Sequence, residues 1–225
     1  MLIEEITNFD LEEGVNDPHI FKAVFLAGGP GSGKSFVANK MLSGTGLKTV
    51  NSDDIFEYLM KKQNMDMGDP EVIGSPEGQA TRNRAKELTQ KRQSIYLEGR
   101  LGLVIDGTGK DVAKVAKAKE ALDQLGYESM MLFVNTSEDV AQDRNTMRDR
   151  SIPAKMVSKM WRQVQDNLMK FQQVFGAKNF HVVDNSGGLE DPDRAENFTQ
   201  VQREIDKFIN SKPQKRQALA WIKQQ

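Results

Sequence analysis

Residues 22–36 read KAVFLAGGPGSGKSF, and this stretch decides the fold. The run AVFLA at residues 23–27 is continuously apolar and shows no alternation, which is typical of a parallel β-strand buried on both faces. The next eight residues, from Gly28 to Ser35, fit the pattern G-x-x-x-x-G-K-[ST]. A helix is expected from Lys34, so the glycine-rich loop joins a strand to a helix, which is the context that this pattern requires.

A loop with this sequence is suited to binding phosphate groups. Its glycines let the backbone approach an anion closely, and the N-terminus of the following helix adds partial positive charge. In such loops the lysine reaches the β- and γ-phosphates of a nucleotide and the next hydroxyl holds Mg²⁺, which are the roles expected of Lys34 and Ser35. We therefore expect ATP and Mg²⁺ as cofactors. The residues predicted to bind the nucleotide are Gly29, Pro30, Gly31, Ser32, Gly33, Lys34, Ser35 and Phe36.

The rest of the chain alternates between strand and helix patterns, which predicts an α/β fold. Further strands are expected at residues 47–51, 103–106, 130–134 and 180–184, and helices at 53–62, roughly 77–98, 111–125, from about 138, 153–175 and from 191. This alternation gives a five-stranded parallel sheet with helices on both faces. Ligands of such sheets bind at the carboxyl ends of the strands, so we expect the functional site at that edge.

The composition is that of a soluble globular domain, with 225 residues, 38% hydrophobic and 28% charged. The chain has no cysteine and two histidines, which excludes disulfides, zinc–thiolate sites and cysteine nucleophiles. Any metal must therefore be bound by oxygen atoms. No apolar run approaches the roughly 20 residues of a membrane helix, and the N-terminus lacks the positive charge of a secretory signal. We expect a cytoplasmic protein with no membrane span.

The two ends of the chain differ in charge. An acidic arm is predicted at residues 1–21, which contain no Lys or Arg, and a basic tail at 212–225, which is expected to be helical. Residues 22–211 form the phosphate-binding domain between them. The formal net charge is −1, so the whole chain has no electrostatic preference for nucleic acid. Solvated termini are the simpler interpretation, and nothing in the sequence supports a protein partner that binds them.

Carboxylates follow two of the predicted strands. Asp106 ends the run Val104-Ile105, where a carboxylate would bind Mg²⁺ together with Ser35. Asp53 and Asp54 follow the strand that ends near Asn51. One of these two aspartates has an obvious structural role as a helix N-cap, and the other could act as a general base toward an acceptor hydroxyl.

Arg144 and Arg148 are four residues apart and share one helix face, and Arg150 follows them. A solvated basic face would explain an ordinary pair of this kind. Phosphate-transferring enzymes, however, need guanidinium groups that neutralise the charge growing on the transferred group, and they often carry them on a mobile lid. We therefore predict a lid over about residues 144–152.

Together these motifs resemble the phage polynucleotide kinase and zeta-toxin branch of the P-loop kinases. The resemblance covers about residues 22–185 and rests on Gly28–Ser35, Asn51–Asp54, Val104–Thr108 and Asp143–Arg148. It implies a phosphotransferase with an alcohol group as acceptor. Carried over by position, it implies Lys34 and Ser35 on nucleotide and Mg²⁺, Asp53 as the catalytic base, Arg148 as the catalytic lid arginine and Arg144 as its helper.

The acceptor of the phosphoryl group is not fixed by these motifs. Phe56 stands where the branch commonly offers an acceptor-contacting arginine, so residues 64–100 are the expected helical insert on the acceptor side. A basic helical face is expected there, and a plain amphipathic surface helix would explain it almost as well. It consists of Thr81, Arg82, Arg84, Lys86, Lys91 and Arg92. A polynucleotide 5′-hydroxyl and the hydroxyl of a nucleotide-sugar or related small molecule both remain open.

Two other classes of function are weaker. Asp106-Gly107-Thr108-Gly109 fits D-x-x-G and Asn135-Thr136-Ser137-Glu138 lies where a GTPase-like switch reads guanine, but the required lysine and aspartate are missing. A protein that binds without catalysis would not need Lys34, Asp53 and Asp106 together.

Overall fold

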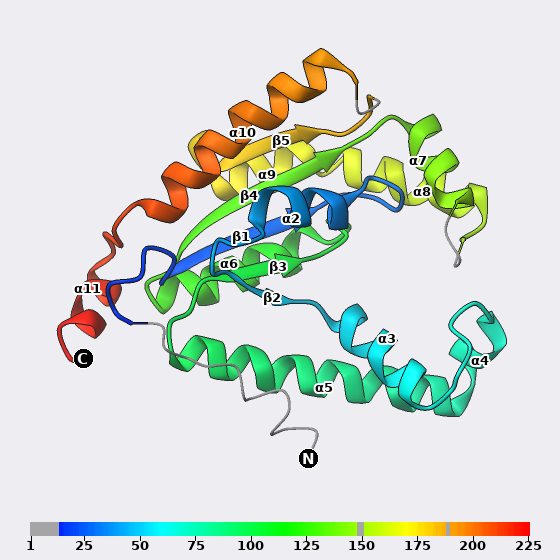
Figure 1. The fold of residues 1–225 in the computed structure, drawn as a ribbon, viewed down its shortest axis with the longest axis horizontal. Coiled ribbons are helices and arrows are strands. Elements are labelled where there is room, and N and C mark those ends of the chain that lie inside the picture. The colour runs from blue at the N-terminus through cyan, green and yellow to red at the C-terminus, as the bar shows by residue number, and fades with distance from the viewer. Residues whose placement is uncertain (1–13, 148–150, 188–189) are drawn as a thin grey trace.

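The computed structural model describes residues 14–147, 151–187 and 190–225, and Figure 1 shows its fold. Five strands form one parallel sheet in the order β2-β3-β1-β4-β5. They are β1 Lys22–Ala27, β2 Lys48–Val50, β3 Leu103–Asp106, β4 Glu128–Asn135 and β5 Phe180–Asp184. The predicted five-stranded parallel sheet is confirmed, and the strand before the glycine-rich loop lies at its centre.

Helices cover both faces of this sheet because the strand residues alternate between two cores. Ala23 and Phe25 of β1 face a core that includes α6 (Val112–Gln124) and α9 (Leu168–Phe175). Val24 and Leu26 face a second core with α2 (Lys34–Leu42) and α10 (Pro192–Asn210). Every residue of β1 is buried, as a central parallel strand requires.

A third, smaller core joins α3 (Ser52–Lys62) to α5 (Pro76–Glu98), which lie alongside each other next to β2 (Figure 1). Between them Asp69 caps a short helix, α4 (Pro70–Gly74), which lies between the helices predicted at 53–62 and 77–98. α5 has 23 residues, yet neither it nor any other helix in the described ranges is long and apolar enough to cross a membrane.

The helix predicted over residues 153–175 is in fact two helices. α8 covers Ala154–Gln165 and follows α7 (Glu138–Thr146), and α9 begins at Leu168. The break lies at Asn167, whose side-chain amide donates to the carbonyl oxygens of Gly109 and Lys110, both at 3.0 Å. Apolar residues at helical spacing, from Val157 to Phe175, continue across the break, and Val164 and Phe171 pack in the same core. The sequence pattern therefore followed the buried face correctly but missed the turn.

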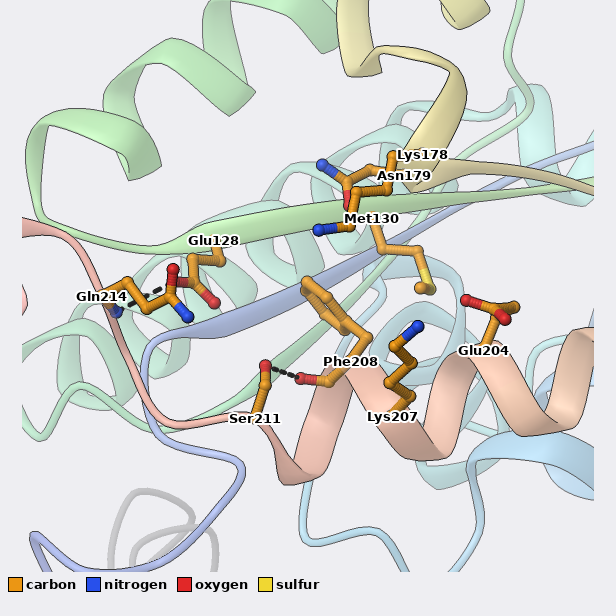
Figure 2. Close-up of a pocket in the computed structure, with 9 residues that line it drawn as sticks. All are labelled: Glu128, Met130, Lys178, Asn179, Glu204, Lys207, Phe208, Ser211 and Gln214. Carbon is orange, nitrogen blue, oxygen red and sulfur yellow. Dashed lines mark hydrogen bonds between the residues drawn. The ribbon is translucent and has the colours of Figure 1, made fainter.

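The C-terminal segment packs against the amino-terminal edge of the sheet instead of extending into solvent. Lys215 donates to Asp123 at 2.7 Å and to the Tyr127 carbonyl at 2.6 Å, and Ala218 of α11 (Arg216–Ile222) is fully buried. A pocket of about 350 Å³ lies at this edge. Figure 2 shows its lining residues, among them Gln214, whose backbone N–H donates to Glu128. The glycine-rich loop lies at the opposite edge, so this pocket is separate from the predicted site.

Candidate functional site

The loop at residues 28–35 leaves the carboxyl end of β1 and runs into α2. Gly31 has a φ of +75°, and a Cβ atom at this position would lie 2.3 Å from the Ala141 carbonyl oxygen, so only glycine fits. Gly33 is the N-cap of α2, with a φ of +83° and no side-chain cap, and the first turn of α2 contains no acidic residue. The N-terminus of α2 thus keeps its partial positive charge, which suits an anion.

Lys34 and Ser35, the side chains predicted to bind phosphate and Mg²⁺, come directly after Gly33 in the sequence. Lys34 Nζ donates to the Gly28 carbonyl at 2.8 Å, so the lysine folds back across the loop. Ser35 and Phe36 are exposed, and 40% of the Phe36 surface is accessible. The lysine is therefore half-buried against the loop, whereas Ser35 is exposed.

Asp106 ends β3, the strand next to β1, and so lies beside the loop. Its Oδ2 accepts a hydrogen bond from Asn51 Nδ2 at 3.2 Å, while its Oδ1 is buried and has no partner among the described residues. Burial raises the pKa of Asp106, and the charge of Lys34 opposes this rise. A buried carboxylate oxygen without a partner is costly unless a cation or water meets it.

This donor set fits a hard divalent cation. Mg²⁺ prefers oxygen ligands and commonly takes only one or two from the protein. The Asp106 carboxylate and the Ser35 hydroxyl are oxygen donors on neighbouring elements at the same edge of the sheet. No group of three or more Asp, Glu or His side chains gathers as a preformed metal cage in the part of the chain described. The site thus suits a metal that takes some of its ligands from the protein and others from a nucleotide.

Asn51 organises the carboxylates that follow β2. Its Oδ1 accepts from the Asp53 backbone N–H at 2.8 Å, and its Nδ2 donates to Asp54 Oδ1 at 3.0 Å and to Asp106 Oδ2. Asn51 is therefore the N-cap of α3, and the expectation that an aspartate caps this helix is wrong. The reason is its extended backbone, since an N-cap residue precedes the first helical turn. Both aspartates are left available for other roles.

The negative charges of these carboxylates affect one another's pKa. The side chain of Asp54 is largely exposed, yet desolvation of its carboxyl group raises its pKa, and the charges of Asp53 and Glu57 raise it further. Asp53 and Asp54 also raise the pKa of Asp106. Acidic groups that influence one another's pKa in this way are typical of functional sites.

Arg144 reaches the same loop from α7. Its Nη1 is buried without a partner among the described residues and lies close to Gly33. Burial lowers the pKa of Arg144, and the positive charge of Arg194 lowers it further. Arg148 and Arg150 lie outside the described residues. The end of α7 is hydrogen-bonded to Ile152. The Asn145 side chain donates to the Ile152 carbonyl at 2.8 Å and accepts from the Ile152 N–H at 3.1 Å.

The residues expected to form a basic face on the insert at 64–100 make contacts of different kinds. Thr81 is buried and donates to Gln63, and Arg84 pairs with Glu87 at 3.1 Å on the surface. The Arg82 guanidinium stacks 4.4 Å from the centroid of the Phe56 ring, which belongs to α3. Arg92 donates to the Tyr96 hydroxyl, and its charge opposes the rise in the pKa of Asp54. Arg82 and Arg92 are thus the two that contact or influence the helix carrying the aspartates.

Sequence reasoning missed a contact between the loop and the end of β5. Asn185, which follows β5, donates from Nδ2 to the Ser32 carbonyl at 2.8 Å, and Arg194 of α10 donates to Asn185 Oδ1. The sequence signal available was only a polar residue at the carboxyl end of the fifth strand. That position predicts proximity to the site but not which loop the side chain holds.

The residues considered for guanine recognition have structural partners. Asn135 Oδ1 accepts from Gln165 at 2.8 Å, and Ser137 caps α7. Both side chains therefore have structural roles in this arrangement.

Comparisons with known proteins agree with this architecture. A family model described as an AAA domain matches residues 24–171. The adenylate kinase of Thermotoga neapolitana is 26% identical over 126 residues, which cover 56% of this chain and 57% of that protein. The chain thus matches little more than half the length of this curated relative.

Two solved structures share the fold. A chain of the PezAT chromosomal toxin–antitoxin system of Streptococcus pneumoniae superposes with a TM-score of 0.59 at 14% identity, covering 92% of this chain and 94% of that one. A chain of the Pnkp1/Rnl/Hen1 RNA repair complex gives 0.51 at 21% identity, covering 68% and 47%. The family match spans most of the sheet, the glycine-rich loop and Asp106. The chain therefore belongs to the AAA domain family, and its fold is that of the P-loop kinases.

Proposed function

We propose that this protein is an ATP-dependent phosphotransferase that moves the γ-phosphate of ATP to a hydroxyl group. The observation that carries the proposal is the meeting of Lys34, Asp106 and the Asp53–Asp54 pair at one edge of the sheet, with their charges influencing one another. A nucleotide switch or a binding protein needs no general base at this position. A kinase needs a carboxylate there to receive the proton of the acceptor.

The glycine-rich loop and Lys34 bind the phosphates of ATP in this proposal. Gly29 to Phe36 surround the nucleotide, and Lys34 leaves the Gly28 carbonyl for the β- and γ-phosphate oxygens, which are stronger acceptors because they are charged. Ser35 and Asp106 hold Mg²⁺, which neutralises phosphate charge when it is bound. The unpartnered Oδ1 of Asp106 supports this assignment.

Asp53 is the proposed general base. The Asp54 carboxylate already accepts a hydrogen bond from Asn51, whereas the exposed Asp53 carboxylate accepts none from the described residues. Asp53 takes the proton of the acceptor hydroxyl as its oxygen bonds to the γ-phosphorus. The bond between that phosphorus and the bridging oxygen then breaks and ADP leaves. Asp54, with its raised pKa, is the alternative base.

Arg144 and Arg148 stabilise the charge on the transferred phosphoryl group in this proposal. Arg144 lies close to Gly33, and a phosphate anion beside its guanidinium group would offset the repulsion that the charge of Arg194 exerts on it. The role of Arg148 rests on its spacing from Arg144 and on the family resemblance. We assign residues 22–211 to the kinase domain, with residues 64–100 on the acceptor side and about 144–152 as the lid.

The acceptor belongs to one of two classes. A polynucleotide 5′-hydroxyl and the hydroxyl of a nucleotide-sugar or related small molecule are both compatible with Arg82 and Arg92 beside α3. AMP, suggested by the matched adenylate kinase, is tested as a compound outside these two classes, because its phosphate group and not a hydroxyl group would be the acceptor. Net charge of −1 gives no preference for a long nucleic acid.

Incubation with γ-labelled ATP and a panel of acceptors tests the proposal. The panel contains a 5′-hydroxyl oligonucleotide, nucleotide-sugars and AMP, and GTP replaces ATP in a parallel series. We expect label transfer from ATP to a member of one class, abolished in Lys34→Ala. Absence of ATP binding in the wild-type protein would refute the proposal, and tight binding of GTP alone would favour a switch.

A further inference from the structure

Asn185, the residue after β5, is hydrogen-bonded to the glycine-rich loop. Asn185 is 2% exposed, and its backbone N–H donates to the Asn135 carbonyl at 2.9 Å, which fixes its position beside β4. Its Nδ2 donates to the Ser32 carbonyl at 2.8 Å in a buried contact. A Cβ atom on Gly33 would lie 2.3 Å from Nδ2, so the loop and this amide are packed as closely as a glycine allows.

Arg194 determines which way this amide points. Its Nε and Nη2 both donate to Asn185 Oδ1, at 3.1 and 2.8 Å, so the oxygen faces α10 and the NH₂ group must face the loop. With the amide reversed, its oxygen would oppose the Ser32 carbonyl and its NH₂ group would oppose the guanidinium. Arg194 is 8% exposed and its guanidinium lies 5.3 and 5.0 Å from the ring centroids of Phe36 and Phe198, so it is itself held in place.

The hydrogen bond to Ser32 orients a peptide group of the loop. In a trans peptide the carbonyl and the following N–H point in opposite directions, so a Ser32 carbonyl directed at Asn185 directs the Gly33 N–H away from it. No described residue accepts from this N–H in the structure. The N–H groups at the start of α2 are those that the loop offers to an anion.

We propose that Arg194 and Asn185 form a positioning pair that sets the Ser32–Gly33 peptide for phosphate binding. Arg194 acts through Asn185, and neither side chain needs to contact the nucleotide. This inference rests on the proposed function, because the anion concerned is the polyphosphate of ATP. A residue of α10, Arg194, would thus contribute to nucleotide affinity although it lies far from the glycine-rich loop in the sequence.

Asn185→Asp tests the pair with little change in volume. The aspartate can still pair with Arg194, but its second oxygen faces the Ser32 carbonyl, so the loop loses a hydrogen bond and meets repulsion. We expect ATP affinity to fall by about tenfold or more, the scale of one hydrogen bond to a charged group. Affinity for AMP, which lacks the β- and γ-phosphates, should fall less. Arg194→Met should weaken ATP binding similarly, and Arg194→Lys, which keeps one donor, should weaken it less.

Asn197→Asp is the matched control. Asn197 also lies on α10 and bonds to β5, accepting from the Asp184 N–H at 2.9 Å and donating to the Val182 carbonyl at 3.1 Å. Its substitution should lower the melting temperature to a similar extent while ATP affinity stays near wild type.

The outcomes separate this inference from the proposed function. If Lys34→Ala weakens ATP binding but a folded Asn185→Asp binds ATP like the wild type, the positioning pair alone is refuted. Equal losses of ATP and AMP affinity in Asn185→Asp and Asn197→Asp would also refute it, because a general loss of stability would then explain both. A wild-type protein that binds no ATP would overturn the proposed function and this inference together.

Discussion

Replacement of Asp53 by asparagine separates catalysis from folding at the proposed base. Asn51 caps α3 through the Asp53 backbone N–H, which the substitution leaves in place. Loss of one negative charge in the first helical turn costs about 0.3–1 kcal/mol through the helix dipole. Relief of repulsion with Asp54 and Asp106 opposes this cost. We therefore expect the melting temperature to change by only a few degrees.

Phosphoryl transfer should respond far more strongly. A positioned base contributes about 10²–10⁴-fold to the rate, which at 1.36 kcal/mol per tenfold is roughly 2.7–5.5 kcal/mol of activation free energy. ATP affinity should remain near wild type because Asp53 has no proposed contact with the nucleotide. Melting temperature, ATP affinity and label transfer to the identified acceptor are measured on the same preparation.

Asp54→Asn is the matched control for this prediction. An asparagine there can still accept from Asn51 Nδ2, so the network at the start of α3 persists. If Asp53→Asn is folded and transfers phosphate near the wild-type rate while Asp54→Asn loses transfer, then Asp54 is the base. Near-native transfer in both variants would refute carboxylate base catalysis at this position altogether.

Three further predictions concern other residues. Lys34→Ala should lose both ATP affinity and transfer in titration and turnover assays, because its cation serves ground and transition states alike, and unchanged transfer would contradict this. Arg144→Ala should lower kcat by about 10–10³-fold without lowering the melting temperature, because its buried Nη1 has no partner among the described residues; a loss of stability alone would indicate a structural arginine. Burial lowers the pKa of His181 below 6.5, so the unfolded chain binds protons more readily and stability falls as pH drops from 6.5 toward the lowered value. His181→Gln should reduce this loss between about pH 7 and pH 5 in urea denaturation, and an unchanged loss would contradict the prediction.

The sequence predicted most of the fold because its strongest signals are local. A continuous apolar run, a glycine pattern and helical stripes depend on neighbouring residues, and each appeared as the expected strand, loop or helix. The stripe from Val157 to Phe175 shows the limit of such signals. Periodicity follows the buried face across a turn, and the turn at Asn167 depends on hydrogen bonds to a loop 57 and 58 residues away in the sequence.

The candidate site divides in the same way. Lys34, Ser35, Asp106 and Asp53 could be placed at one edge because parallel strands end together there. Which residue caps α3 could not be decided, since Asn51 and the two aspartates are all good caps in isolation. The backbone conformation at Asn51 made the choice, and it changed the interpretation of both aspartates.

The sequence by itself determined the parallel sheet, its central strand, the loop that suits phosphate and the types of side chain available at the carboxyl edge. Only the tertiary structure decided that the C-terminal segment packs against the amino-terminal edge of the sheet. It also decided that Asn51 joins Asp54 to Asp106. The hydrogen bond from Asn185 to the Ser32 carbonyl, with Arg194 behind it, is a third contact of this kind. Local patterns are set by residues within a few turns of one another, whereas these contacts join residues up to 153 positions apart. Their partners are selected by packing and by the need to satisfy buried polar groups, which no single segment reveals.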